Sequence, residues 1–461
     1  PYKDILRDYQ KDGYQWLSTM RDYGFNGILA DDMGLGKTLQ VISLLDTMKS
    51  DKPSLVVCPA SLVYNWEEEV HKFTNDLKIT CVVGNEGNRT AIIEGMDRGL
   101  YVTSYDYIRR DYEKYEGITF NYVILDEGQA IKNARTKNAN AVKSLTADHR
   151  LVLTGTPIEN SLAELWSMFD FLMPGYLFNY NYFAKYYERS IVRDEDEEKS
   201  EQLRKLVSPF ILRRNKKEVL TELPDKIESV HAIAFSSEEN DLYYANLASA
   251  NEQLQEVLKM EQVDDIKILA LLTRLRQLCI DQRMIYENIQ QPSEKLKATL
   301  DLIEMLKENQ QKVLLFSSFT SALDLIEDEL MKRDISYYKF TGSVSKENRR
   351  AYVHDFQEEK VDVMLVSLKA GNTGLNLTAA SAVIILDPWW NVSAENQAID
   401  RAYRIGQTKN VLVYQLLMKN TIAEKIFEMQ KNKKQMSDIF VENSKGGISS
   451  LSKEELKNLF T

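Results

Sequence analysis

A chain of 461 residues is long enough for two large domains or about three of average size. Its 44% hydrophobic and 28% charged residues are typical of a globular protein, and no apolar run reaches the roughly 18 residues that predict a membrane-spanning helix. The net charge of −11 argues against a generally basic nucleic-acid-binding protein, although a local basic track on an acidic protein can still bind phosphates.

The first predicted element is an amphipathic helix near the start of the chain that contains Gln10. The amide of Gln10 offers a donor and acceptors that suit the edge of an adenine base. An amphipathic helix explains the residue equally well when it is taken alone. Its position ahead of a phosphate-binding loop makes it a candidate for base recognition.

That loop lies in residues 28–38, which read as a short apolar strand, a glycine-rich loop ending in Gly-Lys-Thr, and a helix. Apolar residues spaced three and four apart over residues 41–48 predict the helix. The backbone N–H groups of such a loop and of the following helix N-terminus face a polyphosphate. This stretch therefore predicts a nucleotide-binding site.

The loop supplies several candidate ligands. Gly34 and Gly36 let the backbone approach the phosphates, Lys37 carries a charge for the outer phosphates, and Thr38 offers a hydroxyl to Mg²⁺. The strict pattern of such loops would place glycine where Asp31 stands, so this loop is a variant. A glycine turn followed by a surface lysine is the alternative interpretation of the stretch by itself.

Two later strands are followed by hydroxyl and amide groups. Ser61 and Asn65 follow the first of them, with Ser61 a possible helix cap, and Thr103 and Ser104 follow the second. Such groups at helix starts suit the phosphates of a nucleic acid. Routine capping within an α/β domain explains them as well, and without further context it is favoured.

A strand over residues 122–125 runs directly into Asp126 and Glu127. A carboxylate at the end of such a strand lies beside the phosphate loop, where Asp126 is expected to hold Mg²⁺ through its water shell. Glu127 is expected to orient and activate the attacking water. A further strand, residues 151–153, ends in small residues at the sheet edge where ligands contact an open α/β sheet.

Residues 31–38, 126–129 and 153–160 together resemble motifs of the SWI/SNF family of superfamily-two ATPases, which are double-stranded DNA translocases that include the chromatin remodellers. The resemblance covers nearly all of the chain. It implies an α/β fold with two RecA-like lobes, each a mostly parallel sheet flanked by helices, with helical insertions between the motifs. In the first lobe it implies a set of residues that couple ATP to DNA: Gln129, Thr154, Gly155 and Thr156.

The resemblance also sets the expected boundaries of the two lobes. The first lobe spans 1–222 with a helical protrusion from about 173, and the second spans 223–461 with a helical insertion at about 235–292 and a C-terminal brace at about 421–461. Residues 242–284 are expected to be helical. The aromatic residues between 176 and 187 are expected to pack in the protrusion rather than to stack on bases.

In the second lobe, a buried strand precedes Ser318, and another leads into a glycine-broken loop at 367–377 that carries one lysine. Small polar groups and a lysine suit close approach to a phosphate backbone. In the family this loop contacts DNA and helps to couple it to ATP. The resemblance therefore implies DNA contacts by Ser318, Lys369, Gly371 and Asn376, and coupling roles for Gly374 and Gln397.

The last motif, residues 397–407, carries Arg401 and Arg404, whose spacing predicts one face of a helix. Phosphoryl transfer needs positive charge on the transferred group, and the resemblance puts two arginine fingers at these positions and a nucleotide contact at Gln407. An amphipathic basic helix is the alternative. Since the nucleotide loop lies in one lobe and the arginines in the other, hydrolysis is expected to require closure of the lobes.

The resemblance thus implies an ATP- and Mg²⁺-dependent double-stranded DNA translocase that does not separate the strands. Its expected partners are duplex DNA and DNA-bound proteins such as nucleosomes or RNA polymerase, with no membrane association, and it is expected to be a monomer in the cytoplasm and nucleoid, or in the nucleus of a eukaryote. A strand-separating DNA or RNA helicase of the same superfamily is one alternative. A nucleotide-switched scaffold, which the acidic pI mildly favours, is the other.

Overall fold

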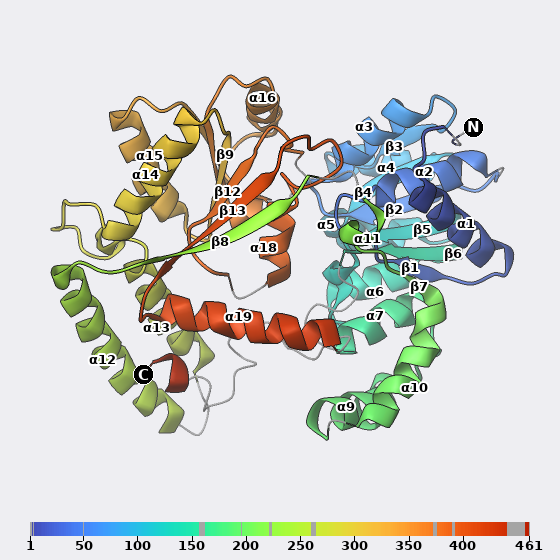
Figure 1. The fold of residues 1–461 in the computed structure, drawn as a ribbon. Coiled ribbons are helices and arrows are strands. Elements are labelled where there is room, and N and C mark those ends of the chain that lie inside the picture. The colour runs from blue at the N-terminus through green and yellow to red at the C-terminus, as the bar shows by residue number, and fades with distance from the viewer. Residues whose placement is uncertain are drawn as a thin grey trace. The chain divides into compact units, whose positions relative to one another are not determined.

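The computed structural model describes residues 2–460 apart from 3, 49, 156–161, 195, 221–223, 260–263, 372–375, 390–391 and 440–456. The chain divides into two compact units, residues 1–221 and most of 222–461 (Figure 1). Each unit is an α/β domain built on its own parallel sheet.

The sheet of unit 1 has the strand order β3-β4-β2-β5-β6-β1-β7, and every pair of neighbours runs parallel. Parallel neighbours need crossover connections, which here are mostly helices. The strands are β1 (Gly27–Leu29), β2 (Ser54–Cys58), β3 (Ile79–Cys81), β4 (Leu100–Ser104), β5 (Thr119–Asp126), β6 (Thr146–Leu153) and β7 (Ile211–Leu212).

Helices cover both faces of this sheet, which explains why its strands are continuous apolar runs. Alternate residues of β5 show the two faces. Val123 and Leu125 enter a cluster with α5 (Tyr105–Asp111), α6 (Lys137–Lys143) and α7 (Leu162–Leu172). Ile124 enters a second cluster on the opposite face, which contains residues of α2 (Lys37–Thr47) and α3 (Val63–Phe73). The remaining main helices are α1 (Asp8–Asp22) and α4 (Glu86–Glu94).

A helical protrusion follows α7 and consists of α8 (Tyr180–Phe183), α9 (Arg189–Arg193) and α10 (Glu197–Val207) (Figure 1). Two of the aromatic residues between 176 and 187 pack as predicted, because Phe183 and Tyr187 are buried in the core of unit 1, whereas Phe178 and Tyr182 are exposed. Tyr182 and Tyr186 stack on each other with ring centroids 5.2 Å apart. Past α10, β7 returns to the sheet beside β1, and α11 (Lys216–Val219) follows.

Unit 2 contains a second parallel sheet with the order β10-β11-β9-β12-β13-β8. Its faces are covered by α14 (Glu294–Glu308) and α15 (Thr320–Lys332) on one side and by α16 (Lys346–Gln357) and α18 (Val392–Ile399) on the other. The strands are β8 (Lys226–Ile233), β9 (Val313–Ser317), β10 (Tyr337–Phe340), β11 (Val363–Ser367), β12 (Ala382–Ile385) and β13 (Val411–Met418). The predicted fold class is therefore confirmed in both units.

The helical insertion differs from the continuous helix expected over residues 242–284. It contains α12 (Ser237–Lys259) and α13 (Asp265–Leu278), followed by a short 3₁₀ turn over Gln282–Met284. Asp264 starts the second helix, because its carboxylate accepts hydrogen bonds from two backbone N–H groups of the first turn at 3.1 and 3.2 Å. Both helices pack with the start of α19 (Ile422–Ile439) (Figure 1). Residues 440–456 of the expected C-terminal brace lie outside the described residues.

A buried carboxyl group in α18 predicts a pH dependence of stability. Trp389 N donates to Glu395 Oε2 at 3.4 Å and Gln415 Nε2 donates to Glu395 Oε1 at 2.8 Å. Burial raises the pKa of Glu395 from 4.5 to about 7. Between these values the folded chain keeps a proton that the unfolded chain releases, so the free energy of unfolding should fall as the pH rises through this window.

Replacing Glu395 with glutamine should remove that fall, which is on the order of 1–3 kcal/mol over the window. Denaturant unfolding between pH 4.5 and 7 measures it, with the parent chain in parallel. An unchanged slope against pH in Glu395→Gln would assign the dependence to another group.

Candidate active site

The predicted phosphate loop is present in unit 1 as a strand, loop and helix. The loop leaves β1, and α2 begins at Lys37 directly after Gly36. Gly34 and Gly36 have φ values of +84° and +73°, in the left-handed region that favours glycine. Lys37 Nζ donates to the Asp31 carbonyl oxygen at 2.6 Å, and Thr38 lies half-buried in the first turn of α2. The loop thus holds its lysine at the N-terminus of a helix, where anions bind.

Gln10 lies on α1 and its side chain contacts the backbone of this loop. Its Nε2 donates to the Leu35 carbonyl at 3.1 Å, and its Oε1 accepts from Arg7 N at 3.0 Å. A Cβ added at Gly36 would lie 2.5 Å from Gln10 Nε2, so a larger residue there would displace the Gln10 amide and would also have to adopt the positive φ. Gln10 is buried, and in the structure it supports the loop. Its contact with an adenine edge stays a prediction.

The two predicted acidic residues stand at the end of β5. Asp126 Oδ2 accepts from Trp66 Nε1 at 2.9 Å, and Tyr105 donates its hydroxyl to the Asp126 carbonyl at 2.9 Å. Burial, together with the neighbouring charge of Glu127, raises the pKa of Asp126 to about 6. Glu127 has φ +53°, a strained value for a residue other than glycine, which is typical of functional positions.

The strand register brings the phosphate loop and the acidic residues to one edge of the sheet. β6 lies between β1 and β5, and its Leu153 is opposite both Leu29 and Asp126. All three strands run parallel, so the segments that follow them emerge on the same side. A Cβ at Gly155, just after β6, would lie 3.8 Å from Met33 N of the loop.

A hydrogen-bonded relay joins the predicted base to the segment after β6. Gln129 Nε2 donates to Glu127 Oε2 at 2.7 Å, and Thr154 Oγ1 donates to Gln129 Oε1 at 3.1 Å. Thr154 N donates to the Leu29 carbonyl at 3.2 Å, which continues the relay to the strand before the phosphate loop. The structure therefore brings together Gln129, Thr154 and Gly155, while Thr156 lies outside the described residues.

The oxygen atoms of Thr38 and Asp126 are ligands of the kind that a magnesium ion binds. Mg²⁺ prefers oxygen ligands and usually binds through one or two protein groups, with substrate phosphates and water completing its shell. Thr38 and Asp126 offer a hydroxyl and a carboxylate at the edge of the sheet described above. Among the described residues there is no group of three or more His, Cys, Asp or Glu that would form a cage without substrate.

The helix expected to carry both arginines ends earlier than predicted. α18 stops at Ile399, and residues 400–406 form turns, so Arg401 and Arg404 do not lie on one helix face. Arg401 is only 1% exposed, and its carbonyl accepts from Leu377 N at 3.0 Å. Arg404 is partly exposed. Leu377 is the last residue of the predicted DNA loop, so this hydrogen bond joins Arg401 to that loop, a tertiary contact that sequence spacing does not reveal.

The side chain of Gln407 is buried and bonded inside unit 2, and its predicted nucleotide contact stays a prediction. Its Nε2 lies within hydrogen-bond distance of the carbonyls of Thr378, Ala380 and Ala402, at 2.8–3.1 Å. Its Oε1 accepts from the backbone N–H groups of residues 408 and 409, both at 2.9 Å. A buried amide with these partners fixes the turn after the arginines.

Two side chains predicted to contact DNA in unit 1 are buried and bonded within the fold. Thr103 is buried, and its hydroxyl donates to the Val82 carbonyl at 3.1 Å. Ser104 is buried and caps α5 by accepting from Tyr107 N at 3.3 Å. Neither side chain reaches the surface, so the capping explanation holds for Ser104. α3 begins at Val63 with Leu62 as its N-cap, so Ser61 is not the cap. Ser61 and Asn65 are partly exposed, and their DNA contacts stay predictions.

In unit 2, Ser318 belongs to a polar cluster at the carboxyl ends of β9 and β12. Its backbone N donates to Asp387 Oδ1 at 3.1 Å, and its hydroxyl also bonds to this carboxylate. Arg276 of α13 donates to Asp387 Oδ2 at 2.9 Å and to Ser318 Oγ at 3.0 Å. The helical insertion therefore fixes Ser318, which is a tertiary link that the sequence does not show.

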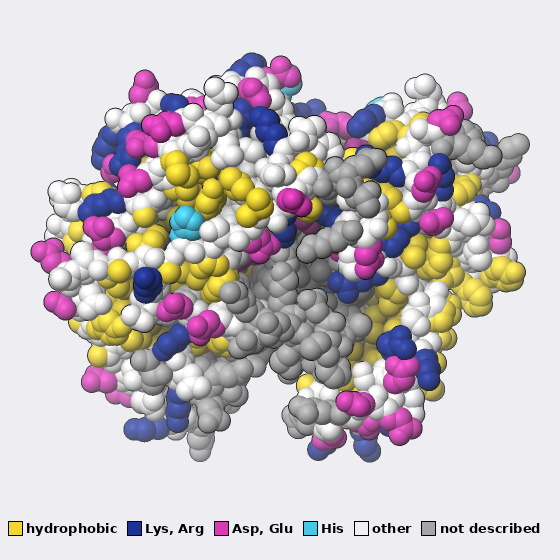
Figure 2. All heavy atoms as spheres, in the orientation of Figure 1, with side chains coloured by type: hydrophobic (Ala, Val, Ile, Leu, Met, Phe, Trp, Pro, Cys, Tyr) yellow, Lys and Arg dark blue, Asp and Glu magenta, His cyan; other side chains and the backbone are white. Residues whose placement is uncertain are grey.

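The remaining candidates of unit 2 are less fully described. Lys369 and Gly371 lie in the short helix α17 (Leu368–Gly371), and Asn376 is exposed. Gln397 is partly exposed on α18, and Gly374 lies outside the described residues. On the face shown in Figure 2, basic and acidic side chains are interspersed rather than separated into one basic tract. The DNA contacts in this unit stay predictions.

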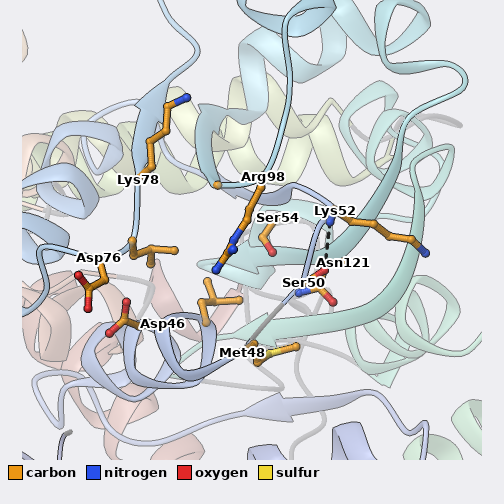
Figure 3. A pocket seen from close by; sticks show the side chains of 12 residues that line it. Asp46, Met48, Ser50, Lys52, Ser54, Asp76, Lys78, Arg98 and Asn121 are labelled. Carbon is orange, nitrogen blue, oxygen red and sulfur yellow. Dashed lines mark hydrogen bonds between the residues drawn. The ribbon is translucent and has the colours of Figure 1, made fainter.

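A cavity of about 280 Å³ in unit 1 is not the nucleotide site (Figure 3). It lies between the end of α2 and the amino ends of β2 and β4, and so at the sheet edge opposite to Asp126. Arg98 points into it, whereas Lys52 and Lys78 extend away, and these two form ion pairs with Asp148 and Asp97. Its mixed charge, with Asp46 and Asp76 in the lining, does not favour a polyphosphate.

Comparison with known proteins agrees with this geometry. The SNF2-related domain matches residues 9–284, and the helicase conserved C-terminal domain matches residues 294–406. The chain is 39% identical over 99% of its length to the uncharacterized ATP-dependent helicase MG018 of Mycoplasma genitalium, and 38% identical over 100% to the putative ATP-dependent helicase/translocase YwqA of Bacillus subtilis. It spans 44% and 51% of these relatives.

More distant similarities extend to eukaryotes and archaea. The chain is 33% identical over 99% of its length to the TATA-binding protein-associated factor MOT1 of Saccharomyces cerevisiae, of which it spans 28%. A solved structure of the Sulfolobus solfataricus SWI2/SNF2 ATPase core in complex with dsDNA is 34% identical, with 99% of this chain and 97% of that chain covered and a TM-score of 0.48. Among the described helices, none has the length and apolar character needed to cross a bilayer.

Proposed function

The chain belongs to the SNF2-related family of ATPases, and on this premise we propose that it is a motor enzyme that hydrolyses ATP on double-stranded DNA, moves along the duplex without separating its strands, and displaces proteins bound to it. The observation that carries the proposal is the relay from Glu127 through Gln129 to Thr154 beside the phosphate loop. In the proposal, this relay links Glu127, the group that activates water, to the segment after β6, through which DNA binding would reach the nucleotide site. Relatives named as a helicase/translocase and as a TATA-binding protein-associated factor support the class of activity.

The first unit binds the nucleotide in this proposal. The N–H groups of the loop around Gly34 and Gly36 and the charge of Lys37 hold the phosphates. Thr38 and Asp126 hold Mg²⁺, which when bound neutralises negative charge on the phosphates. Glu127 accepts a proton from the attacking water, and Gln129 keeps its carboxylate oriented through the 2.7 Å hydrogen bond.

The second unit would complete the reaction by supplying positive charge from the partly exposed Arg404, while Arg401, three residues earlier, is buried. Charge on the transferred phosphoryl group grows as the bond breaks, so an arginine acts most strongly at that stage. DNA contacts on both units, from Ser61 and Asn65 and from the 367–377 loop, would then make hydrolysis depend on the duplex. Repeated binding and release of DNA would convert each ATP into a step.

Replacing Thr154 with valine tests the relay. Valine has nearly the same shape but cannot donate to Gln129, so ATP affinity should persist while DNA-stimulated hydrolysis falls about tenfold toward the basal rate. Thr299→Val is the matched control, because Thr299 is a buried threonine whose hydroxyl donates at 2.7 Å to the Lys295 carbonyl in unit 2. Equal stimulation of the Thr154→Val variant and the parent chain would remove Thr154 from the coupling role.

The function itself is tested by measuring ATP hydrolysis without nucleic acid and with single-stranded DNA, duplex DNA or duplex RNA. The salt concentration must be fixed, because binding driven by phosphate contacts weakens steeply with salt. Stimulation by duplex DNA alone, with displacement of a triplex-forming strand and no unwinding of the duplex, is the expected result. Stimulation by single strands or RNA with unwinding would favour a helicase, and ATP binding without any stimulation would favour a scaffold.

A further inference from the structure

The segment that leaves the sheet of unit 1 runs beside the phosphate loop. β7 pairs with β1, with Leu212 opposite Leu29. Beyond the pair of strands, Ala30 N donates to the Leu212 carbonyl at 2.7 Å, and Asp32 N donates to the Arg214 carbonyl at 3.0 Å. Lys216 N in turn donates to Asp32 Oδ2 at 3.0 Å. The backbone of the first half of the loop is thus bonded at alternate residues, Ala30 and Asp32, to a segment about 180 positions later in the chain.

The side chain of Arg214 reaches under the loop. Its Nε donates to Asp31 Oδ1 at 2.8 Å, and its Nη2 bonds to the other oxygen of the same carboxylate. Nη2 also donates to Gln40 Oε1 at 2.9 Å, while Nη1 bonds to the Tyr9 carbonyl. Gln40 Nε2 donates back to Asp31 Oδ2 at 3.1 Å, which closes the network. A bidentate arginine–carboxylate pair of this kind fixes geometry as well as charge.

The network is buried, so its charged groups must be paired within it. Asp31 is 0% exposed, and a buried carboxylate needs both a counter-charge and hydrogen bonds. A Cβ at Gly13 of α1 would lie 1.8 Å from Gln40 Oε1 and 2.7 Å from Arg214 Nη2, so the helix backbone closes over the pair. Asp31 occupies the position where the strict phosphate-loop pattern has glycine. An aspartate at this position needs a positively charged partner, and Arg214 supplies it.

Asp31 also connects the network to the predicted phosphate ligand. Its carbonyl accepts from Lys37 Nζ at 2.6 Å, while its carboxylate is held by Arg214. The same residue therefore orients the lysine through its backbone and is oriented by the arginine through its side chain. Without Arg214, the carboxylate would place an uncompensated negative charge at a site for phosphates, which repel it.

We propose that Arg214 is a positioning residue of the nucleotide site, which neutralises Asp31 and holds the phosphate loop in its binding conformation without touching the nucleotide. The inference rests on the proposed binding of ATP by unit 1. It predicts that loss of Arg214 weakens nucleotide affinity more than it lowers the rate at saturating ATP. It also predicts that the loss is corrected in part by removing the charge of Asp31.

The test uses Arg214→Gln and the double variant Asp31→Asn/Arg214→Gln in the full chain, with equilibrium binding of a fluorescent ATP analogue in the presence of Mg²⁺. Arg214→Gln should raise the Kd about tenfold or more, and the double variant should bind more tightly than Arg214→Gln alone. Arg89→Gln is the matched control, because Arg89 forms a similarly bidentate, buried pair with Asp111 at 2.6 and 3.1 Å elsewhere in unit 1. It should lower the melting temperature while leaving the Kd within about twofold.

Arg214→Lys provides a second variant that keeps the charge but loses the bidentate geometry, and it should give an intermediate Kd even if Arg214→Gln does not fold. A Kd in Arg214→Lys and Arg214→Gln equal to that of the parent chain would overturn the inference, as would an equal loss in Arg89→Gln or a double variant no better than Arg214→Gln. Failure of the parent chain to bind the analogue at all, or binding unaffected by Lys37→Ala, would instead reject the proposed function.

Discussion

Glutamine in place of Glu127 is expected to leave ATP affinity close to that of the parent chain and to lower DNA-stimulated hydrolysis by about 10²–10⁴-fold. The carboxylate is the only part of the side chain that changes. Glutamine keeps an oxygen that can accept from Gln129 Nε2, now at 2.7 Å from Glu127 Oε2, and it tolerates the backbone φ of +53° about as well as glutamate does. The relay and the fold should therefore persist while the proton acceptor is lost.

Single-turnover hydrolysis with saturating duplex DNA separates this effect from product release, and equilibrium binding of the nucleotide reports on the site. Glu113→Gln is the control, because Glu113 is an exposed carboxylate in the same unit. Turnover in Glu127→Gln within a few-fold of the parent rate would show that Glu127 is not the base. The hydrogen-bonded relay from Glu127 to Thr154 would then have no catalytic function. A simultaneous loss of ATP binding would point to a wider disturbance of the sheet edge.

The sequence predicted the features whose chemistry is local. The glycines before Lys37 predicted a loop followed by a helix, and the apolar run before Asp126 predicted a strand that ends at this carboxylate. The structure confirms the helix and the strand. Parallel strands place their carboxyl ends at one edge, so the phosphate loop, the acidic residues and the segment after β6 were expected to meet. The order of strands then explains why Leu153 faces both Leu29 and Asp126.

Features that depend on tertiary contacts could not be predicted in the same way. The spacing of Arg401 and Arg404 indicated one helix face, but α18 ends at Ile399 and the carbonyl of Arg401 bonds instead to Leu377 N. Likewise, a hydroxyl such as that of Thr103 looks the same in sequence whether it faces solvent or, as here, the Val82 carbonyl. Burial is a property of the assembled fold, and periodicity alone does not report it.

Other functional neighbours were missed because they lie far away in the chain. Trp66, which donates to Asp126 at 2.9 Å, is 60 positions from it, and Arg214 is 183 positions from Asp31. A signal for the second pair was nevertheless present, because Asp31 departs from the glycine of the strict pattern and a carboxylate there needs a cation. The sequence gives no means of pairing Asp31 with Arg214, because only the assembled fold brings the two side chains together.

Alanine at Arg404 is expected to spare ATP binding and to lower kcat by about 10³-fold or more, since an arginine finger contributes about 10³–10⁵ to the rate of phosphoryl transfer. The partly exposed side chain of Arg404 lies in a turn held by Gln407, whose amide bonds to the backbone on both sides. Truncating it should leave that turn intact. Steady-state hydrolysis at saturating ATP and duplex DNA, with nucleotide binding measured separately, tests the role.

Arg401 must be judged by a different criterion, because its side chain is 1% exposed. Arg401→Ala should lower the melting temperature as well as kcat, since removing a buried side chain leaves a cavity and disturbs its neighbours. Arg333→Ala is the control for the loss of a partly exposed arginine in unit 2, where it bridges to Glu304 at 3.0 Å. If Arg404→Ala retains the parent kcat while Arg401→Ala loses activity only in proportion to its unfolding, neither arginine acts on the phosphoryl group. If Arg404→Ala alone loses activity without losing stability, the exposed residue of the pair is the finger, and the buried one holds its turn in place.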